Sequence, residues 1–247
     1  MSVPGFDDAR ERLDAARERL GDARERVEEA VADVAVQVRP RLRGWIHLGA
    51  APVAAIAGLV LVLLAPSGAR LAAAVYASSV VALFTTSATY HRGRWSDAAR
   101  ARMRRLDHSM IYVLIAGTYT PFALLALEGT SRWGVLAAVW GGAAVGVGLK
   151  MLARHPHRVL SAVLYLLLGW AGVVVLPQLL DTTGTTAFVL VLVGGALYTV
   201  GALVYASQRP DPSPRWFGFH EVFHSLTVAA AGFQYVAVSM VTYRFAV

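Results

Sequence analysis

The sequence predicts an all-α membrane protein built as a seven-transmembrane helix bundle, and two observations lead to this fold class. Hydrophobic residues make up 56% of the chain and charged residues only 16%, which is too apolar for an ordinary soluble domain. Several stretches are also long enough, and poor enough in charge, to cross a hydrocarbon core of about 30 Å as helices. Their apolar runs are continuous, whereas barrel strands alternate apolar and polar residues, so helices are expected.

The predicted spans follow one another with short connections. They cover residues 45–65, 71–91, 108–127, 133–149, 159–180, 187–206 and 219–243. Of the basic residues that flank them, fourteen fall on the side of the N-terminus and three on the opposite side. Because Lys and Arg accumulate in cytoplasmic connections, we expect a plasma-membrane protein with its N-terminus in the cytoplasm and its C-terminus outside. These arginines then serve as topology signals and contacts to lipid phosphates, and no nucleic-acid partner is expected.

Residues 1–42 are expected to form a cytoplasmic tail ahead of a transmembrane domain at residues 43–247. The tail begins with a charged segment, unlike a cleavable signal peptide. The motifs "DARERL", "DAARERL" and "DARERV" recur with a seven-residue period, which predicts a heptad-patterned helix. Its apolar seam consists of Leu13, Leu20, Val27 and Val34, with Ala9, Ala16, Ala23 and Ala30 at the other core position. Residues 8–38 therefore either form a homo-oligomer or dock a partner helix, or lie along the membrane surface.

Polar residues of three separate spans are predicted to meet at the cytoplasmic membrane face. His91 ends the second span with Ser87 one turn deeper, Asp107 opens the third span, and His220 and His224 begin the seventh. Residues four apart share one face of a helix, so each pair can face the same ion. The chain has no cysteine, so a metal ion must be bound by His, Asp, Glu or water.

Two of these histidines belong to "HEVFH", residues 220–224, which has the His-Glu-x-x-His spacing of zinc peptidases. Such peptidases generally take a third ligand from farther along the chain. Residues 225–247 contain no Glu, Asp or His, so the third ligand must come from upstream, where His91 is the best-placed candidate.

In these motifs the chain resembles the hemolysin III family of the progestin and adipoQ receptor (PAQR) superfamily, and its metal site is similar to that of the alkaline ceramidases. The matching residues are Ser87 and His91, Asp107 in "DHSMIYVLIAGTYTPF", and His220 and His224. The resemblance covers residues 45–243 and implies a Zn2+ ion held by His91, His220 and His224. It also implies a water contacted by Asp107, with Ser87 alongside. Glu221 is then incidental to the metal site, because the superfamily pattern requires only the two histidines of this motif.

A zinc ion with three histidine ligands and an open fourth position lowers the pKa of its water toward about 7. Asp107 would then move a proton to a leaving amine, and Ser87 would hydrogen-bond the water or the developing oxyanion. By analogy with the superfamily we expect hydrolysis of lipid amides such as ceramides. The alternatives are a non-catalytic membrane sensor or receptor with a structural zinc, and a membrane-damaging, hemolysin-type protein.

Two further histidines lie at the same level. His47, near the cytoplasmic end of the first span, could contact and orient one of the metal ligands without binding the ion itself. His108 neighbours Asp107 but faces a different direction on its helix, so we expect a capping or interface role there.

Overall fold

A computed structural model of the chain describes residue 16 and residues 20–21, 40–152 and 158–244. Almost all of the heptad-patterned tail lies outside this part, so its association stays a prediction. Seven helical segments of the described part are long and apolar enough to cross a membrane. The only β pairing among the described residues is an isolated bridge between Ser213 and Phe217, and the prediction of an all-α, seven-helix membrane fold is confirmed.

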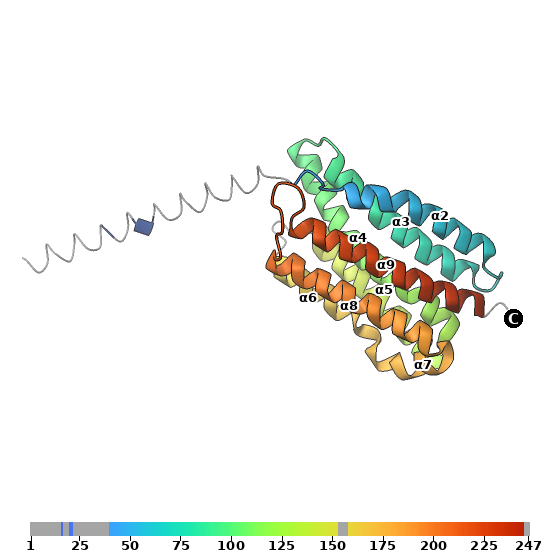
Figure 1. The fold of residues 1–247 in the computed structure, drawn as a ribbon. Helices are drawn as coiled ribbons and strands as arrows, with labels where there is room; N and C mark the ends of the chain where they lie inside the picture. Colours follow the sequence, from blue (N-terminus) through green and yellow to red (C-terminus); the bar gives the residue numbers. More distant parts are fainter. Residues whose placement is uncertain (1–15, 17–19, 22–39, 153–157, 245–247) are drawn as a thin grey trace, which may run out of the picture.

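The helices run back and forth along the bundle in sequence order (Figure 1). They are α2 Trp45–Leu64, α3 Arg70–Arg92, α4 Asp97–Ala126, α5 Gly129–Leu152, α6 Arg158–Gly169, the 3-10 helix η1 Ala171–Val175, α7 Leu176–Thr183, α8 Thr185–Ser207 and α9 Phe219–Arg244. All but two of the spans begin and end close to the predicted bounds. The exceptions are α4, which begins earlier, and the fifth span, which is broken.

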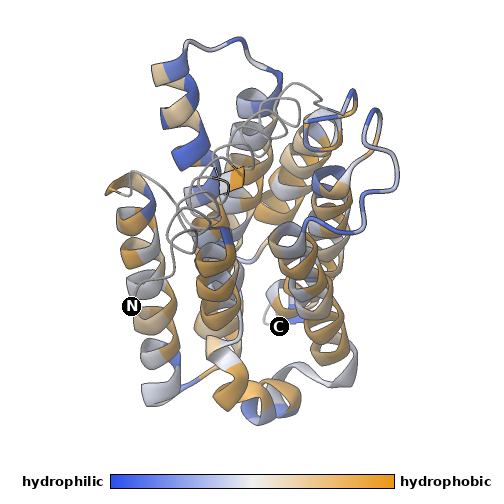
Figure 2. Ribbon diagram, turned by 90° about the vertical axis from the view of Figure 1, so that its left-hand side faces the viewer, coloured by the Kyte–Doolittle hydropathy of each residue, from blue (hydrophilic) through white to orange (hydrophobic). Residues whose placement is uncertain are grey.

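Helix α9 holds the bundle together, because it packs against α2, α3, α4 and α8. The outer faces remain apolar: Val53, Ile56 and Leu63 of α2, for example, are exposed in the isolated chain. Hydrophobic residues follow the length of the helices, and the most hydrophilic segments gather mainly at one end (Figure 2). Such a surface is suited to lipid contact along its sides and to water at its ends.

Helix α4 begins at Asp97, well before the predicted start at residue 108. The Ser96 side chain caps it by accepting a hydrogen bond from the backbone N–H of Ala99 at 3.4 Å. The first turns are rich in arginine, so a count of apolar residues does not detect them. Asp107 therefore lies inside a continuous helix instead of opening one.

The fifth span is interrupted between α6 and α7 by η1. Tyr119 of α4 stabilises the break, because its hydroxyl donates to the Gly169 carbonyl at 2.6 Å and accepts from the Gly172 N–H at 3.2 Å. A Cβ at Gly172 would lie 2.4 Å from Cε1 of Tyr119, so only glycine allows this approach. Irregular backbone inside a membrane is tolerated where its polar groups find such protein partners.

Replacing Tyr119 by phenylalanine should lower the free energy of unfolding by about 1–3 kcal/mol, since both backbone groups at the break lose their partner. The thermal midpoint of the purified protein in detergent measures this loss. Tyr243→Phe is the matched control, because the Tyr243 hydroxyl makes no hydrogen bond to the described residues and its ring is half-buried. Equal midpoints for the two variants would contradict the role of Tyr119.

Candidate metal centre

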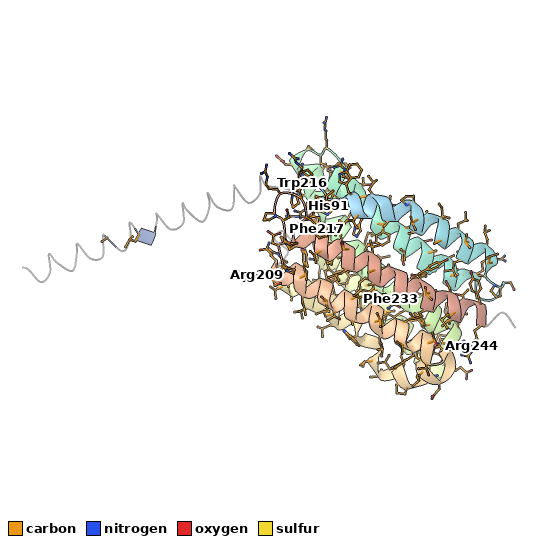
Figure 3. All side chains as sticks on the ribbon, viewed as in Figure 1. His91, Arg209, Trp216, Phe217, Phe233 and Arg244 are labelled. Atoms are coloured by element: carbon orange, nitrogen blue, oxygen red, sulfur yellow. The ribbon has the colours of Figure 1, made fainter. Side chains whose placement is uncertain are left out.

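Three histidines from two helices converge at the end of the bundle where α9 begins. His91 lies in the last turn of α3, and His220 and His224 lie one turn apart at the start of α9. One ring nitrogen from each falls within 4.8 Å of the other two, and Nε2 of His91 is 3.1 Å from Nε2 of His220. Figure 3 shows His91 at the end of the bundle where α9 begins. The structure thus brings together the three residues predicted as metal ligands.

This arrangement fits a zinc ion. With Zn–N bonds of about 2.0–2.1 Å and tetrahedral angles, ligand nitrogens lie about 3.4 Å apart, close to the spacing of His91 and His220. His220 and His224 are buried, and Nδ1 of His224 has no hydrogen-bond partner in the described part of the chain. A buried polar atom without a partner is costly, so this imidazole is suited to a ligand that the protein itself does not supply.

Asp107 and Ser87 lie beside the histidine cluster. Oδ2 of Asp107 is 3.9 Å from Nε2 of His91 and 3.8 Å from Nδ1 of His108. The Ser87 side chain is within hydrogen-bonding reach of the Asp107 carboxylate. The structure therefore places Ser87 beside the aspartate, and its contact with a water or an oxyanion stays a prediction. Both side chains line the cavity next to the histidines.

The start of α2 supports the cluster from a third side. The buried His47 ring stacks on the His224 ring, with centroids 3.8 Å apart and an angle of 14° between the planes. Gly44, just before α2, has φ of 82°, and a Cβ there would lie 2.7 Å from Cβ of His91. A larger residue at Gly44 would be strained and would displace His91. The close approach of Gly44 to His91 was not predicted from the sequence. Its only signal there is a glycine just before the first apolar run.

Glu221, the glutamate of "HEVFH", caps α9 and is not part of the histidine cluster. Its side chain is fully buried, and Oε2 accepts a hydrogen bond from the Gly218 N–H at 2.9 Å. Oδ1 of Asp211 accepts from the Phe219 N–H, also at 2.9 Å. A glutamate that reaches back to the residue three positions earlier is half of a capping box. Glu221 thus stabilises the turn that presents His220, and it is not among the described groups that could hold a metal ion.

His108 is likewise held in a structural contact. Its Nδ1 lies 2.7 Å from the Arg104 carbonyl oxygen, and its Nε2 lies 2.9 Å from the Tyr205 hydroxyl. The Tyr205 contact joins α4 to α8, which agrees with the interface role expected for this residue.

A long cavity extends from the histidines into the bundle. Its lining runs along α4 from Asp107 to Ala123 and reaches Leu176 and Leu179 of α7. A helix rises about 1.5 Å per residue, so the lined part of α4 is about 24 Å long. The cavity volume is about 180 Å³, and most of the lining is apolar. The site therefore lies at one end of a long, mostly apolar cavity.

Comparison with known proteins matches residues 36–235 to the model of the family described as haemolysin-III related. The chain belongs to the hemolysin III family. Every residue of the histidine cluster, together with Ser87 and Asp107, falls inside the matched stretch.

Two bacterial members of the hemolysin III family are similar in sequence. Hemolysin-3 of Bacillus cereus is 39% identical over 104 residues, which are 42% of this chain and 48% of that protein. The Hemolysin-3 homolog of Bacillus subtilis (strain 168) is 38% identical over 115 residues, 46% of this chain and 54% of that protein. The chain thus spans about half the length of these curated relatives.

A weaker similarity links this hemolysin III protein to the wider PAQR superfamily. Progestin and adipoQ receptor-like protein 1 of Caenorhabditis elegans is 26% identical over 151 residues, 55% of this chain and 35% of that protein. The family and superfamily expected from the sequence motifs are therefore confirmed.

Proposed function

We propose that this hemolysin III protein is a zinc-dependent hydrolase of lipid amides, acting at the cytoplasmic face of the plasma membrane. The observation that carries the proposal is the position of the histidine cluster and Asp107 at one end of the long apolar cavity. A purely structural metal needs no cavity beside it. An acyl chain, by contrast, needs an apolar channel of this length to leave the bilayer without contacting water.

His91, His220 and His224 would hold the ion, which would supply an activated water and a Lewis acid near neutral pH. Asp107 is placed to accept the proton of the attacking water on its carboxylate. As the new C–O bond forms and the amide C–N bond breaks, Asp107 returns that proton to the leaving nitrogen, which gives a fatty acid and a free amine. Ser87 orients the Asp107 carboxylate for both transfers.

The cavity would bind the acyl chain along α4, with the amide near Asp107 and the amine portion toward the cytoplasmic headgroups. A long acyl chain fills the apolar lining of the cavity, whereas a short one leaves most of that lining without a contact. A ceramide, or another N-acyl lipid with a long chain, is therefore the expected substrate class.

The test is fatty-acid release by the full-length protein in lipid nanodiscs. A ceramide with a 16-carbon acyl chain should be hydrolysed after zinc loading, and hydrolysis should stop on chelation and return with zinc. The matched substrate with a two-carbon acyl group should react at least about tenfold less efficiently. Stoichiometric zinc without hydrolysis of any long-chain amide would overturn the proposal and favour a structural metal in a sensor or receptor.

A further inference from the structure

A second pocket lies beside the metal cavity, at the same end of the bundle, and three helices contribute positive charges to it. Arg104 comes from α4, Lys150 from the end of α5 and Arg158 from the start of α6. The remaining lining consists of His108, Val159, Tyr205 and Ala206. No carboxylate lines this pocket among the described residues.

Lys150 is the most unusual member of this basic pocket, because it is only 6% exposed. Its ammonium group donates to the Ser161 hydroxyl and lies 5.8 Å from the centre of the Tyr165 ring. Neither partner carries a negative charge. A buried ammonium group without a counter-ion is costly, and most lysines at a membrane boundary avoid this cost by extending into water.

The neighbouring side chains increase the positive potential at Lys150. Arg104 lies close enough to repel it, and neither Arg104 nor Arg158 forms an ion pair with a carboxylate in the described part of the chain. Arginines that act only as topology signals project separately into water, whereas these charges line one pocket.

The carboxylate of Asp107, next to His108 in the chain, is separated from the basic pocket by two side chains. It lines the metal cavity and not the basic pocket. The two side chains are those of His108 and Tyr205, which hydrogen-bond to each other at 2.9 Å and line both spaces. The basic pocket is therefore separate from the metal centre but adjacent to it.

We propose that the basic pocket binds a phosphate group. Two guanidinium groups provide paired N–H donors that match phosphate oxygens, and the buried Lys150 provides a compact ammonium charge in the lining. The bound phosphate would supply the counter-charge that the described protein residues do not. The same chemistry is present in the headgroup of an anionic lipid and in free inorganic phosphate.

Binding is tested with the full-length protein purified in a phosphate-free maltoside detergent, by titration calorimetry. Inorganic phosphate and dioctanoyl phosphatidic acid are the two probes, and dioctanoylglycerol is the matched lipid without phosphate. Tight binding of the phosphatidic acid alone would identify a lipid headgroup as the source, and equal binding of both phosphates would identify a soluble one. In either case dioctanoylglycerol should not bind at this pocket.

Lys150→Gln and Arg158→Gln should each weaken phosphate binding by about tenfold. Arg102→Gln is the matched control, because it removes the same charge from an exposed position of α4 outside the pocket, and binding should change less than twofold. His224→Ala should also bind phosphate normally, so this result is independent of the metal and of the proposed hydrolysis. Failure of both phosphate probes to bind, or equal weakening in Arg102→Gln and Arg158→Gln, would overturn the proposal.

Discussion

Zinc content is expected to fall from about one ion per chain to nearly none when His224 is replaced by alanine. Two histidines would remain, and a catalytic zinc site needs three protein ligands to compete with chelators and water. Metal analysis of the purified protein measures the loss directly. A zinc-dependent rise in thermal midpoint provides a second readout, because an ion present at about 1,000 times its dissociation constant stabilises the fold by about 4 kcal/mol. His224→Ala should lose this rise.

Glu221→Gln is the matched control within the same motif. Glutamine keeps a side-chain oxygen that can accept the hydrogen bond from the Gly218 N–H, and Glu221 is not among the clustered groups. This variant should therefore retain its zinc. If His224→Ala kept its zinc, or if both variants lost it equally, the assignment of the metal ligands would be wrong.

Turnover of a long-chain amide is expected to fall by at least about 100-fold in Asp107→Asn, with zinc content unchanged. Asparagine has the same shape and keeps an oxygen within reach of Ser87, but it cannot accept the proton of the attacking water. The measurement is kcat at saturating substrate, alongside the zinc content of the same preparation. Because kcat reports on proton transfer and zinc content reports on the fold of the site, the two readouts separate a catalytic defect from a structural one.

Ser87→Ala is expected to lower kcat less than Asp107→Asn does. It removes a side chain that orients the carboxylate, so kcat should fall by only about tenfold. Wild-type turnover in Asp107→Asn would refute its role in proton transfer. Loss of zinc in that variant would instead show that Asp107 helps to hold the metal.

The helices of the bundle could be predicted from the sequence because membrane spans are recognisable from the length and the apolar character of consecutive residues. The first and last spans were predicted to within one residue of α2 and α9 at each end. Helix boundaries that depend on side-chain contacts and not on hydropathy could not be predicted in this way. The charged start of α4 is stabilised by the Ser96 cap, and the break before α7 is stabilised by Tyr119, a residue from another helix.

The residues of the candidate site could also be predicted only in part from the sequence. His220 and His224 could be paired from their spacing alone, and His91 could be added because the chain offers no ligand after residue 224. The stacking of His47 on His224 and the contact of Ser87 with Asp107 depend on how α2, α3 and α4 are rotated about their axes. Hydropathy contains little information on such rotation.

The sequence by itself determined the seven-helix membrane fold, the family and the histidines that come together, because local spacing and the apolar character of each span are properties of consecutive residues. Only the tertiary structure decided that Glu221 caps a helix, that an apolar cavity extends from the cluster, and that Lys150 faces a pocket of positive charge. The cavity and the basic pocket arise from the packing of residues far apart in the chain, where side chains that line a space become neighbours only after the helices have assembled.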